Sequence, residues 1–312
     1  MAPAYDEAAS ASDRLLNGAG PRRGGEPIMQ GDMDMPEPPV EPQSDGPQDE
    51  SWAAAAKREA RKQWDHDPAG SVAVEDDPLG TPESFRKVEA HRYAEQPWMH
   101  DTFHYDRYRG QRVLEIGVGL GTDHLQFARA GARLTGIDLT QRCIDLTAAR
   151  FEQERLESRL IQMDAEGLEF EEDSFDAVYS FGVLHHTPSP ERAFREVRRV
   201  LRPGGVFIGG LYNERSAFYA RVRLERLVRM EFLHETLEHR RARIEHSTSD
   251  AVPLVRLFTA RELRALLRES GFPDVRLTRR HLGLGRFTDR LPTWIERGGG
   301  RLAGWYLVHT AR

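Results

Sequence analysis

The chain has 312 residues, enough for one large domain with appendages, and its 39% hydrophobic and 30% charged side chains are typical of a globular protein. No apolar run approaches the roughly 20 residues that cross a bilayer, so we expect no membrane span, and the first residues lack the features of a secretory signal. The net charge of −6 is concentrated in residues 1–50, where eleven acidic side chains face three arginines, so the rest of the chain is near +2 and nucleic acid is not expected as the main partner.

The N-terminal part divides into two segments. Residues 1–50 are rich in proline, glycine and acid and poor in large apolar side chains, which predicts a disordered acidic tail. A helix is expected from Trp52 to about Asp65, and a second from about Pro82 to Tyr93, with Thr81 as its N-cap. We expect residues 51–110 to form a helical cover over one end of the core.

From residue 111 onward the pattern alternates as in a parallel sheet with crossover helices. Helices are expected at about 122–130, 140–154 and 189–201. The expected strands are 112–117, 133–138, 159–163, 175–181, 204–211, 274–281 and 304–310. The fold class is therefore α/β, a doubly wound and mostly parallel seven-stranded sheet.

A long segment interrupts the last part of this domain, which spans 111–312. Residues 214–258 are rich in Arg, Glu and Leu with helical apolar spacing, and they are too long for an ordinary connection. Their position after the fifth strand suits a helical lid over a substrate. Thr259 and Glu262 then form the signature of a capping box at the start of a further helix.

A glycine-rich turn follows the first expected strand. Gly117, Gly119 and Gly121 stand at alternate positions directly after an apolar run. Glycines open a backbone path closed to other residues, so a ligand can lie against the main chain. The alternative is a sharp strand-to-helix connection without a ligand.

Two aspartates follow the next two strands. Asp138 lies 21 residues after Gly117, where an acidic side chain can accept hydrogen bonds from both hydroxyls of a ribose. Asp164 follows the third strand, where it can accept from an exocyclic adenine amine. The alternatives are a helix N-cap for Asp138 and an ordinary turn residue for Asp164. Together with the glycine turn, these strand ends indicate a nucleoside site for a nicotinamide cofactor or S-adenosylmethionine.

Five stretches make the chain resemble the class I S-adenosylmethionine-dependent methyltransferases of the type found in ubiquinone and menaquinone biosynthesis. The resemblance is tight over about 100–212 and loose beyond. The stretches are Val-Leu-Glu-Ile-Gly-Val-Gly-Leu-Gly from Val113, Gly-Ile-Asp from Gly136, Met-Asp-Ala from Met163, Phe-Asp-Ala-Val-Tyr-Ser-Phe-Gly-Val-Leu-His-His from Phe175, and Leu-Arg-Pro-Gly-Gly from Leu201.

The resemblance implies S-adenosylmethionine as the cofactor and a role for each matching residue. The three glycines would pass its methionine part, and Asp138 would hold the ribose. The remaining implied contacts are Glu115 near the amino group, the Ser180 carbonyl on the ammonium, Leu139 packed on the adenine, Asp164 and the Ala165 amide at its edge, and Tyr93 above the site.

His185 and His186 follow the fourth expected strand, beside the implied position of the methyl group. An imidazole suits the removal of a proton near neutral pH, so both are candidate catalytic bases. The alternative is that they pack or cap the next helix. No third ligand stands at a recognisable spacing, so no metal site is expected. The single Cys143 excludes a disulfide framework and fits a reducing cytoplasm.

Selectivity is expected to reside outside the sheet. The arginines of the insert could bind an acidic substrate, or form surface ion pairs with the glutamates among them. Aromatic side chains of the N-terminal cover could line the substrate site or belong to the core. They are Phe85, Tyr93, Trp98, Phe103, Tyr105 and Tyr108.

The sequence therefore predicts an enzyme that transfers a methyl group from S-adenosylmethionine to a small-molecule acceptor. Because the sulfonium is already activated, such a transfer depends mainly on proximity and on exclusion of water beneath a lid. The alternatives are an NAD(P)-dependent oxidoreductase and a module that binds the cofactor without turnover. The sequence does not indicate the acceptor atom or the oligomeric state.

Overall fold

The computed structural model describes residues 50–74, 78–230, 249–283 and 293–312, together with residues 236, 240–241 and 244–245. Residues 1–49, which make up almost all of the expected acidic tail, lie outside the described residues.

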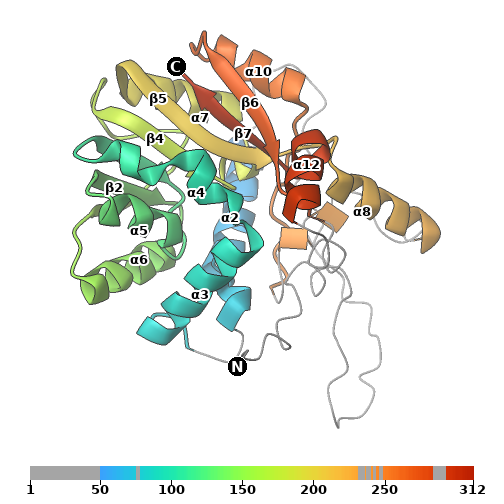
Figure 1. Cartoon of the computed structure of the whole chain (residues 1–312), viewed down its shortest axis with the longest axis horizontal. Coiled ribbons are helices and arrows are strands. Elements are labelled where there is room, and N and C mark those ends of the chain that lie inside the picture. The colour runs from blue at the N-terminus through green and yellow to red at the C-terminus, as the bar shows by residue number, and fades with distance from the viewer. Residues whose placement is uncertain are drawn as a thin grey trace.

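Seven strands form one sheet in the order β3-β2-β1-β4-β5-β7-β6. Its strands are β1 (Arg112–Ile116), β2 (Arg133–Asp138), β3 (Arg159–Gln162), β4 (Phe175–Phe181), β5 (Leu201–Tyr212), β6 (Val275–Arg280) and β7 (Tyr306–Ala311). The first five are parallel, whereas β7 is antiparallel to both of its neighbours, β5 and β6. Because the strand order reverses between β1 and β4, the sheet is doubly wound, and the predicted fold class is confirmed (Figure 1).

Helices connect the strands at the positions that the sequence indicated. Thr140 caps α6 by accepting a hydrogen bond from the Cys143 amide, and Thr259 and Glu262 form the expected capping box of α10. These helices are α5 (Thr122–Arg129), α6 (Gln141–Glu154), α7 (Pro190–Val200) and α10 (Ala260–Glu269).

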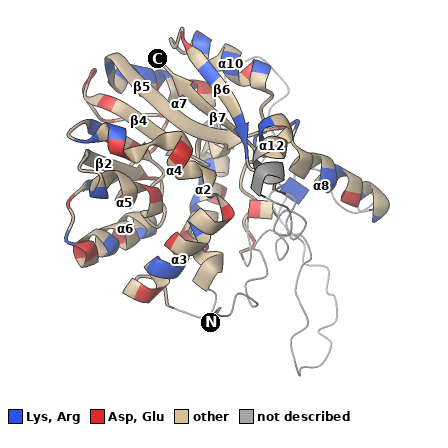
Figure 2. Cartoon of the chain, viewed as in Figure 1, with Lys and Arg blue, Asp and Glu red and all other residues tan. Residues whose placement is uncertain are grey.

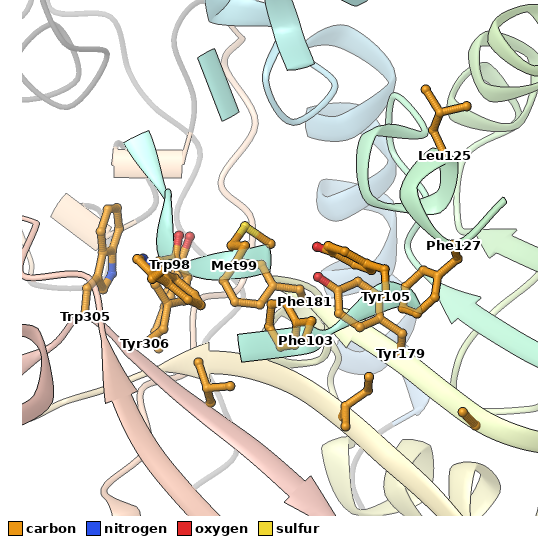
Figure 3. Packing of buried hydrophobic residues seen from close by; sticks show 14 of the residues in the cluster. Trp98, Met99, Phe103, Tyr105, Leu125, Phe127, Tyr179, Phe181, Trp305 and Tyr306 are labelled. Atoms are coloured by element: carbon orange, nitrogen blue, oxygen red, sulfur yellow. The ribbon is translucent and has the colours of Figure 1, made fainter. Parts of the chain in front are cut away.

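Both faces of the sheet are covered. Along β1, Val113 belongs to one buried cluster and Leu114 to another, and along β4 the same holds for Tyr179 and Val178. This period of two is that of a strand with apolar neighbours on both sides. α7 and α10 pack in the cluster of Leu114, while the first cluster joins aromatic rings from distant segments (Figure 3).

The N-terminal segment supplies further elements before the sheet. They are α2 (Glu50–His66), η1 (Ser71–Val74), α3 (Pro82–Glu95), α4 (Trp98–Phe103) and η2 (Tyr105–Tyr108). α3 begins with the predicted N-cap Thr81, whose side chain accepts from the Ser84 amide while Ser84 Oγ accepts from the Thr81 amide. Trp98, Phe103 and Tyr105 are buried in the core cluster, which is the second of the two roles considered for these aromatics.

The structure differs from the sequence prediction at three places. β5 begins at Leu201, because Leu201 pairs with Phe175 before an irregularity leads to the Val206–Ala177 pair. In the insert, α8 (Ala217–Val228) is helical as expected, but residues 249–257 contain no helix. A helix that was not predicted, α12 (Thr293–Ala303), precedes β7.

Within the described ranges, no helix is both long and apolar enough to cross a lipid bilayer.

Candidate functional site

A cavity of about 320 Å³ lies at the carboxyl ends of the parallel strands. The segments that follow β1, β2, β3 and β4 all reach it, which is where ligands of doubly wound folds bind. α2 and α3 close it from the side of the N-terminal cover, and residues at the facing ends of β6 and β7 close it from the other. The cavity therefore has a wall from the sheet and a wall from the cover.

The glycine turn lies on the sheet wall with all three glycines at positive φ. Gly119 has φ +54°, and a Cβ there would meet nothing within 4 Å, so its open side faces the cavity. A Cβ at Gly117 would lie 2.3 Å from the Val183 side chain, and one at Gly121 would lie 2.9 Å from Thr147. Gly117 and Gly119 line the cavity, whereas Gly121 begins α5 and packs against α6.

Asp138 ties the second strand to this turn. One carboxylate oxygen accepts from the Gly119 amide at 3.1 Å, and the other accepts from the amide and hydroxyl of Thr140, both at 3.0 Å. Burial raises the pKa of Asp138, although the hydrogen bonds from Thr140 and Gly119 act to lower it. The N-cap of α6 is Thr140, so the N-cap alternative for Asp138 is wrong. The side chain lines the cavity beside the glycine turn.

Two side chains of α6 hold the turn from behind. Thr147 donates to the Gly119 carbonyl at 3.0 Å, and the buried Arg150 donates to the Leu120 carbonyl at 3.1 Å. Arg150 also pairs with Glu89 of α3 at 2.6 Å. These contacts connect the cover to the loop through a guanidinium that sequence reasoning did not single out.

Asp164 lies in the cavity wall after β3, where it meets a lysine of the cover. One of its oxygens is 2.7 Å from Lys57 Nζ of α2, and the other accepts from the Glu166 amide at 2.9 Å. Lys57 also pairs with Glu166 at 2.6 Å. Leu139 and Ala165 also line the cavity.

Glu115 lies at the buried end of the cavity, near the glycine turn. Its Oε2 is 2.9 Å from Nδ1 of His124. Burial raises the pKa of Glu115 well above its ordinary value, with a further rise from Asp123, and burial lowers the pKa of His124 to about 3. A cation placed beside Glu115 would favour its ionised form and so oppose this shift.

Arg92 of α3 lines the cavity, one residue before the predicted Tyr93. Its guanidinium is 2.6 Å from Asp123 and 5.0 Å from the centre of the Phe181 ring. Tyr93 is not among the described residues that line the cavity, and its hydroxyl donates to Asp123 at 3.0 Å. The helical spacing of the α3 residues on the cavity wall, Val88, His91, Arg92 and Glu95, was the available signal.

Ser180 is placed behind the wall. Its hydroxyl donates to the Ile116 carbonyl at 3.2 Å. Its carbonyl oxygen points at β5, because a Cβ on Gly209 would lie only 1.9 Å from it. The next two residues, Phe181 and Gly182, are the ones that line the cavity.

The two histidines occupy different places in η3 (Leu184–His186). His185 is fully buried outside the cavity wall, and neither of its ring nitrogens has a hydrogen-bond partner among the described residues. His186 lines the cavity, but its Nδ1 bonds the Leu254 carbonyl at 2.7 Å and its Nε2 lies 3.8 Å from Glu245. Burial lowers the pKa of His185 well below its ordinary value and that of His186 to about 4.

Aromatic rings dominate the end of the cavity away from Asp164. Phe181 of β4, Trp305 and Tyr306 line it, together with Trp64 of α2 and His281 after β6. Trp64 meets the His186 ring edge-on with centroids 5.3 Å apart, and Phe181 lies 4.6 Å from Tyr306. Figure 3 shows Trp305, Tyr306 and Phe181 in one row with the rings of the core. Burial lowers the pKa of His281 to about 4, and the nearby guanidinium of Arg92, which lies over the Phe181 ring, lowers it further.

The aromatics expected from the cover do not form this wall. None of Phe85, Tyr93, Trp98, Phe103, Tyr105 or Tyr108 is among the described residues that line the cavity. In the part of the chain that the structure describes, no group of three or more His, Cys, Asp or Glu side chains is placed to hold a metal ion.

Residues 114–209, from the first strand to the fifth, match the family model described as a methyltransferase domain. The chain contains a class I S-adenosylmethionine-dependent methyltransferase domain. The family predicted from the five sequence stretches is confirmed, and a nicotinamide-dependent oxidoreductase is set aside.

Curated relatives of this methyltransferase domain match it over part of their length. A protein named sterol 24-C-methyltransferase from Gibberella zeae is 32% identical over 46% of this chain and 35% of that protein. One named fatty-acid O-methyltransferase from Mycolicibacterium smegmatis is 38% identical over 43% of this chain and 48% of that protein. The chain thus spans less than half the length of these relatives.

Among solved structures, an S-adenosylmethionine-dependent methyltransferase from Mesorhizobium loti superimposes with a TM-score of 0.46 at 19% identity, covering 66% of this chain and 92% of that one.

The cofactor of this methyltransferase domain is S-adenosylmethionine, and the cavity fits it on three observations. The open side of Gly119 leaves room for a ligand against the backbone. Asp138 presents a buried carboxylate beside that space, and Glu115 is a buried acid that a cation would stabilise.

Proposed function

We propose that this protein transfers a methyl group from S-adenosylmethionine to a small apolar acceptor. The observation that carries the proposal is that one cavity contains two unlike ends, a polar end built by the glycine turn and Asp138 and an aromatic end built by Phe181, Trp305 and Tyr306. A donor and an acceptor held in one closed space need little further help from side chains.

At the polar end, we assign the nucleoside part of the cofactor to the ends of β2 and β3. Asp138 would accept from the ribose hydroxyls, as the free lone pairs of a carboxylate allow alongside its bonds to Thr140 and Gly119. Leu139 would pack on the adenine, and Asp164 with the Ala165 amide would meet its edge. The ion pair of Asp164 with Lys57 supports this, because it holds that carboxylate at the cavity wall.

The amino-acid end of the cofactor carries one positive and one negative group. We assign its ammonium to Glu115 and its carboxylate to Arg92, since both line the cavity beside Gly117. Binding there would pair Glu115 with the ammonium and Arg92 with the carboxylate of the same ligand. We assign no cofactor contact to Ser180 or Gly121. Ser180 holds β4 in place, and Gly121 holds the start of α5.

The bound cofactor supplies an activated methyl group on a sulfonium. The residues of the chain hold the acceptor close and exclude water. His186 serves as part of the wall in this proposal, because both of its ring nitrogens point at the insert, toward Leu254 and Glu245. Proximity and desolvation then account for the rate without an assigned base.

We propose residues 51–110 as a cover and 111–312 as the methyltransferase domain, with 214–258 as its lid. α2 and α3 form a wall of the cavity. The insert contacts η3, because the Arg256 amide donates to the His185 carbonyl at 2.9 Å. The relatives named for sterols and fatty acids support an apolar acceptor. The buried and unpaired Cys143 supports a reducing cytoplasm.

The first experiment measures cofactor binding by calorimetry with S-adenosylmethionine and with NAD. Only the former is expected to bind, and Asp138→Ala is expected to weaken it at least about tenfold, or about 1.4 kcal/mol. Asp145→Ala is the control, because Asp145 is an exposed residue of α6 that bonds only Gln141. Unchanged affinity in Asp138→Ala would refute the ribose assignment.

The second experiment distinguishes an enzyme from a module that only binds. Candidate apolar alcohols, phenols and carboxylic acids are screened for release of S-adenosylhomocysteine. Release with at least one acceptor is expected. Cofactor binding with no release across the series would favour the non-catalytic alternative.

A further inference from the structure

The first turn of helix α5 is buried, although the helix also carries charge on its outer side. Figure 2 shows charged residues on α5 and α6, and among them Arg129 of α5 pairs with Glu154 of α6 at 3.0 Å. Thr122, Asp123 and His124 form the first turn, directly after the glycine turn, and all three are buried. His124 has no exposed surface at all.

The imidazole ring of His124 is fixed by contacts from several elements. Its Nδ1 lies 2.9 Å from Oε2 of Glu115, and its Nε2 lies 2.8 Å from Oγ of Ser158. The ring of Phe151 in α6 lies 5.1 Å away, centroid to centroid. Gly136 of β2 makes room for the imidazole, because a Cβ there would lie 3.0 Å from Cε1 of His124. A ring that is bonded at both nitrogens cannot turn without losing both bonds.

The imidazole of His124 is neutral, because burial lowers its pKa to about 3, and two proton arrangements then satisfy its hydrogen bonds. In the first, the Ser158 hydroxyl donates to Nε2 and the N–H of Nδ1 donates to the Glu115 carboxylate. In the second, the Ser158 hydroxyl donates to the Leu134 carbonyl at 3.3 Å and accepts from Nε2, while a protonated Glu115 donates to Nδ1. The first arrangement is the one that suits a cation beside Glu115.

Glu115 keeps one oxygen for a ligand. Its side chain lines the cavity, and within the described ranges Oε1 has no hydrogen-bond partner, whereas Oε2 is held by His124. Burial and the nearby Asp123 raise the pKa of Glu115, so its carboxylate needs a hydrogen-bond donor to meet a cation in the ionised form. Nδ1 of His124 is placed to be that donor.

We propose that His124 is a positioning residue that presents Glu115 to the ammonium group of the cofactor. The imidazole holds Oε2 and leaves Oε1 for the ligand. This inference rests on the proposed function, which assigns the ammonium to Glu115. His124 itself is not among the described residues that line the cavity, so it acts only through Glu115. A histidine that merely fills the core would have no effect that depends on the amino group of the ligand.

The test compares three ligands by calorimetry on the full chain. They are S-adenosylhomocysteine, its analogue in which hydrogen replaces the amino group, and 5′-methylthioadenosine, which lacks the amino-acid part. We expect the wild type to prefer S-adenosylhomocysteine over the analogue at least about tenfold, because hydrogen bonds between charged groups are the stronger ones. Failure of all three ligands to bind would overturn the proposed function and this inference with it, whereas the variants can overturn this inference alone.

His124→Phe is expected to lower the preference for the amino group at least about fivefold, while the affinity for 5′-methylthioadenosine stays within about twofold. His124→Asn is expected to regain at least about twofold of the lost preference, because its amide can place an N–H donor near the position of Nδ1. The unchanged binding of 5′-methylthioadenosine reports that the polar end of the cavity is folded in both variants.

His309→Phe is the matched control. His309 is a buried histidine of β7 that lies outside the cavity wall, and neither of its ring nitrogens has a hydrogen-bond partner in the described part of the chain. The preference for the amino group is expected to stay within about twofold of the wild type in this control.

Three results would overturn the proposal. One is an unchanged preference in His124→Phe, and another is an equal loss of preference in His309→Phe. The third is an equal loss of affinity for all three ligands in His124→Phe, because a disturbed glycine turn would then be the cause. Ser158→Ala removes the bond to Nε2 at a partly exposed position and is expected to lower the preference by about two- to threefold. If His124→Phe does not fold, an unchanged preference in Ser158→Ala overturns the proposal.

Discussion

The two ends of the cavity are built in different ways. The polar end comes from one continuous part of the chain, 115–165, and almost every polar group in it is held by neighbours on that part or by α2 and α3. The aromatic end joins residues far apart in sequence, from Trp64 to Tyr306. The family model covers 114–209, so it includes the polar end and leaves most of the aromatic end outside. On the proposed function, cofactor binding belongs to the part that matches the family model, and acceptor choice belongs mostly to the part outside it.

The largest effect is expected when an added side chain fills the polar end of the cavity. Gly119→Leu places a side chain in the open space against which the cofactor would lie, and we expect cofactor affinity to fall by about 100-fold or more, or about 2.7 kcal/mol. Calorimetry measures the loss.

Gly110→Leu is its matched control. Gly110 also has positive φ, +72°, and nothing within 4 Å of its Cβ position, but it does not line the cavity. Both variants carry the same backbone penalty of about 1 kcal/mol. Equal loss of cofactor affinity in the two would show that strain, and not occupied space, causes the effect.

The aromatic end is tested with Trp64→Leu. We expect the KM of an active acceptor to rise about tenfold while cofactor affinity stays within about twofold, because Trp64 borders the acceptor space. Trp52→Leu in the same helix is the control, since Trp52 is buried outside the cavity wall. A fall in cofactor affinity with Trp64→Leu would mean that the two ends are not separable.

The buried carboxyl group of Glu245, behind the aromatic end of the cavity, should make the stability of the protein depend on pH. Burial raises the pKa of Glu245 to about 8, although the Tyr212 hydroxyl that donates to it at 3.1 Å acts to lower it. A raised carboxyl pKa means that the folded state binds the proton more tightly than the unfolded state. This contribution to stability is complete below the ordinary pKa near 4.5 and is lost as pH rises through about 8.

We therefore expect the stability of the wild type to fall relative to that of Glu245→Gln between pH 5 and pH 8, at most by about 1.4 kcal/mol per pH unit. The comparison with Glu245→Gln isolates this effect, because the buried histidines, whose lowered pKa acts in the opposite direction, are common to both proteins. Differential scanning calorimetry across this range measures both proteins. A slope unchanged by the substitution would contradict a neutral Glu245 behind the acceptor end.

The smallest effect on cofactor affinity is expected for the ion pairs between α2 and the polar end of the cavity. Lys57→Met removes the ion pairs with Asp164 and Glu166, and we expect cofactor affinity to fall by two- to fivefold, or up to about 1 kcal/mol, because the pair is partly exposed. Lys62→Met is the control. Lys62 belongs to the same helix as Lys57, but its partner is the exposed Asp250. Equal affinity of both variants would remove Lys57 from the cofactor site.

The polar end was predictable because its chemistry is local. The glycine turn, Asp138 and Asp164 each follow a strand whose apolar run is evident in sequence, and parallel strands place their carboxyl ends at one edge. Arg92 was missed by one position in favour of Tyr93, although the spacing from Val88 already identified the cavity face of α3. Tyr93 was chosen because its side chain is aromatic, before its position around the helix relative to Val88 was considered.

The aromatic end was beyond sequence reasoning for two physical reasons. Trp305 and Trp64 meet the cavity only through tertiary packing of α2 and of the β6–β7 pair. The helix α12 before β7 contains three successive glycines, which disfavour a helix. Its close packing explains one of them, because a Cβ on Gly300 would lie 3.1 Å from the His281 amide nitrogen.

The place of β7 has a consequence for how the chain folds. β7 is the last of the seven strands along the chain, yet it lies inside the sheet, and β6 has β7 as its sole neighbour in the strand order. During synthesis, β6 and the exposed edge of β5 remain without a partner until Tyr306–Ala311 has left the ribosome. Neither the completed sheet nor the aromatic end can form before that moment, so the aromatic end forms after the strands that carry the polar end have been made.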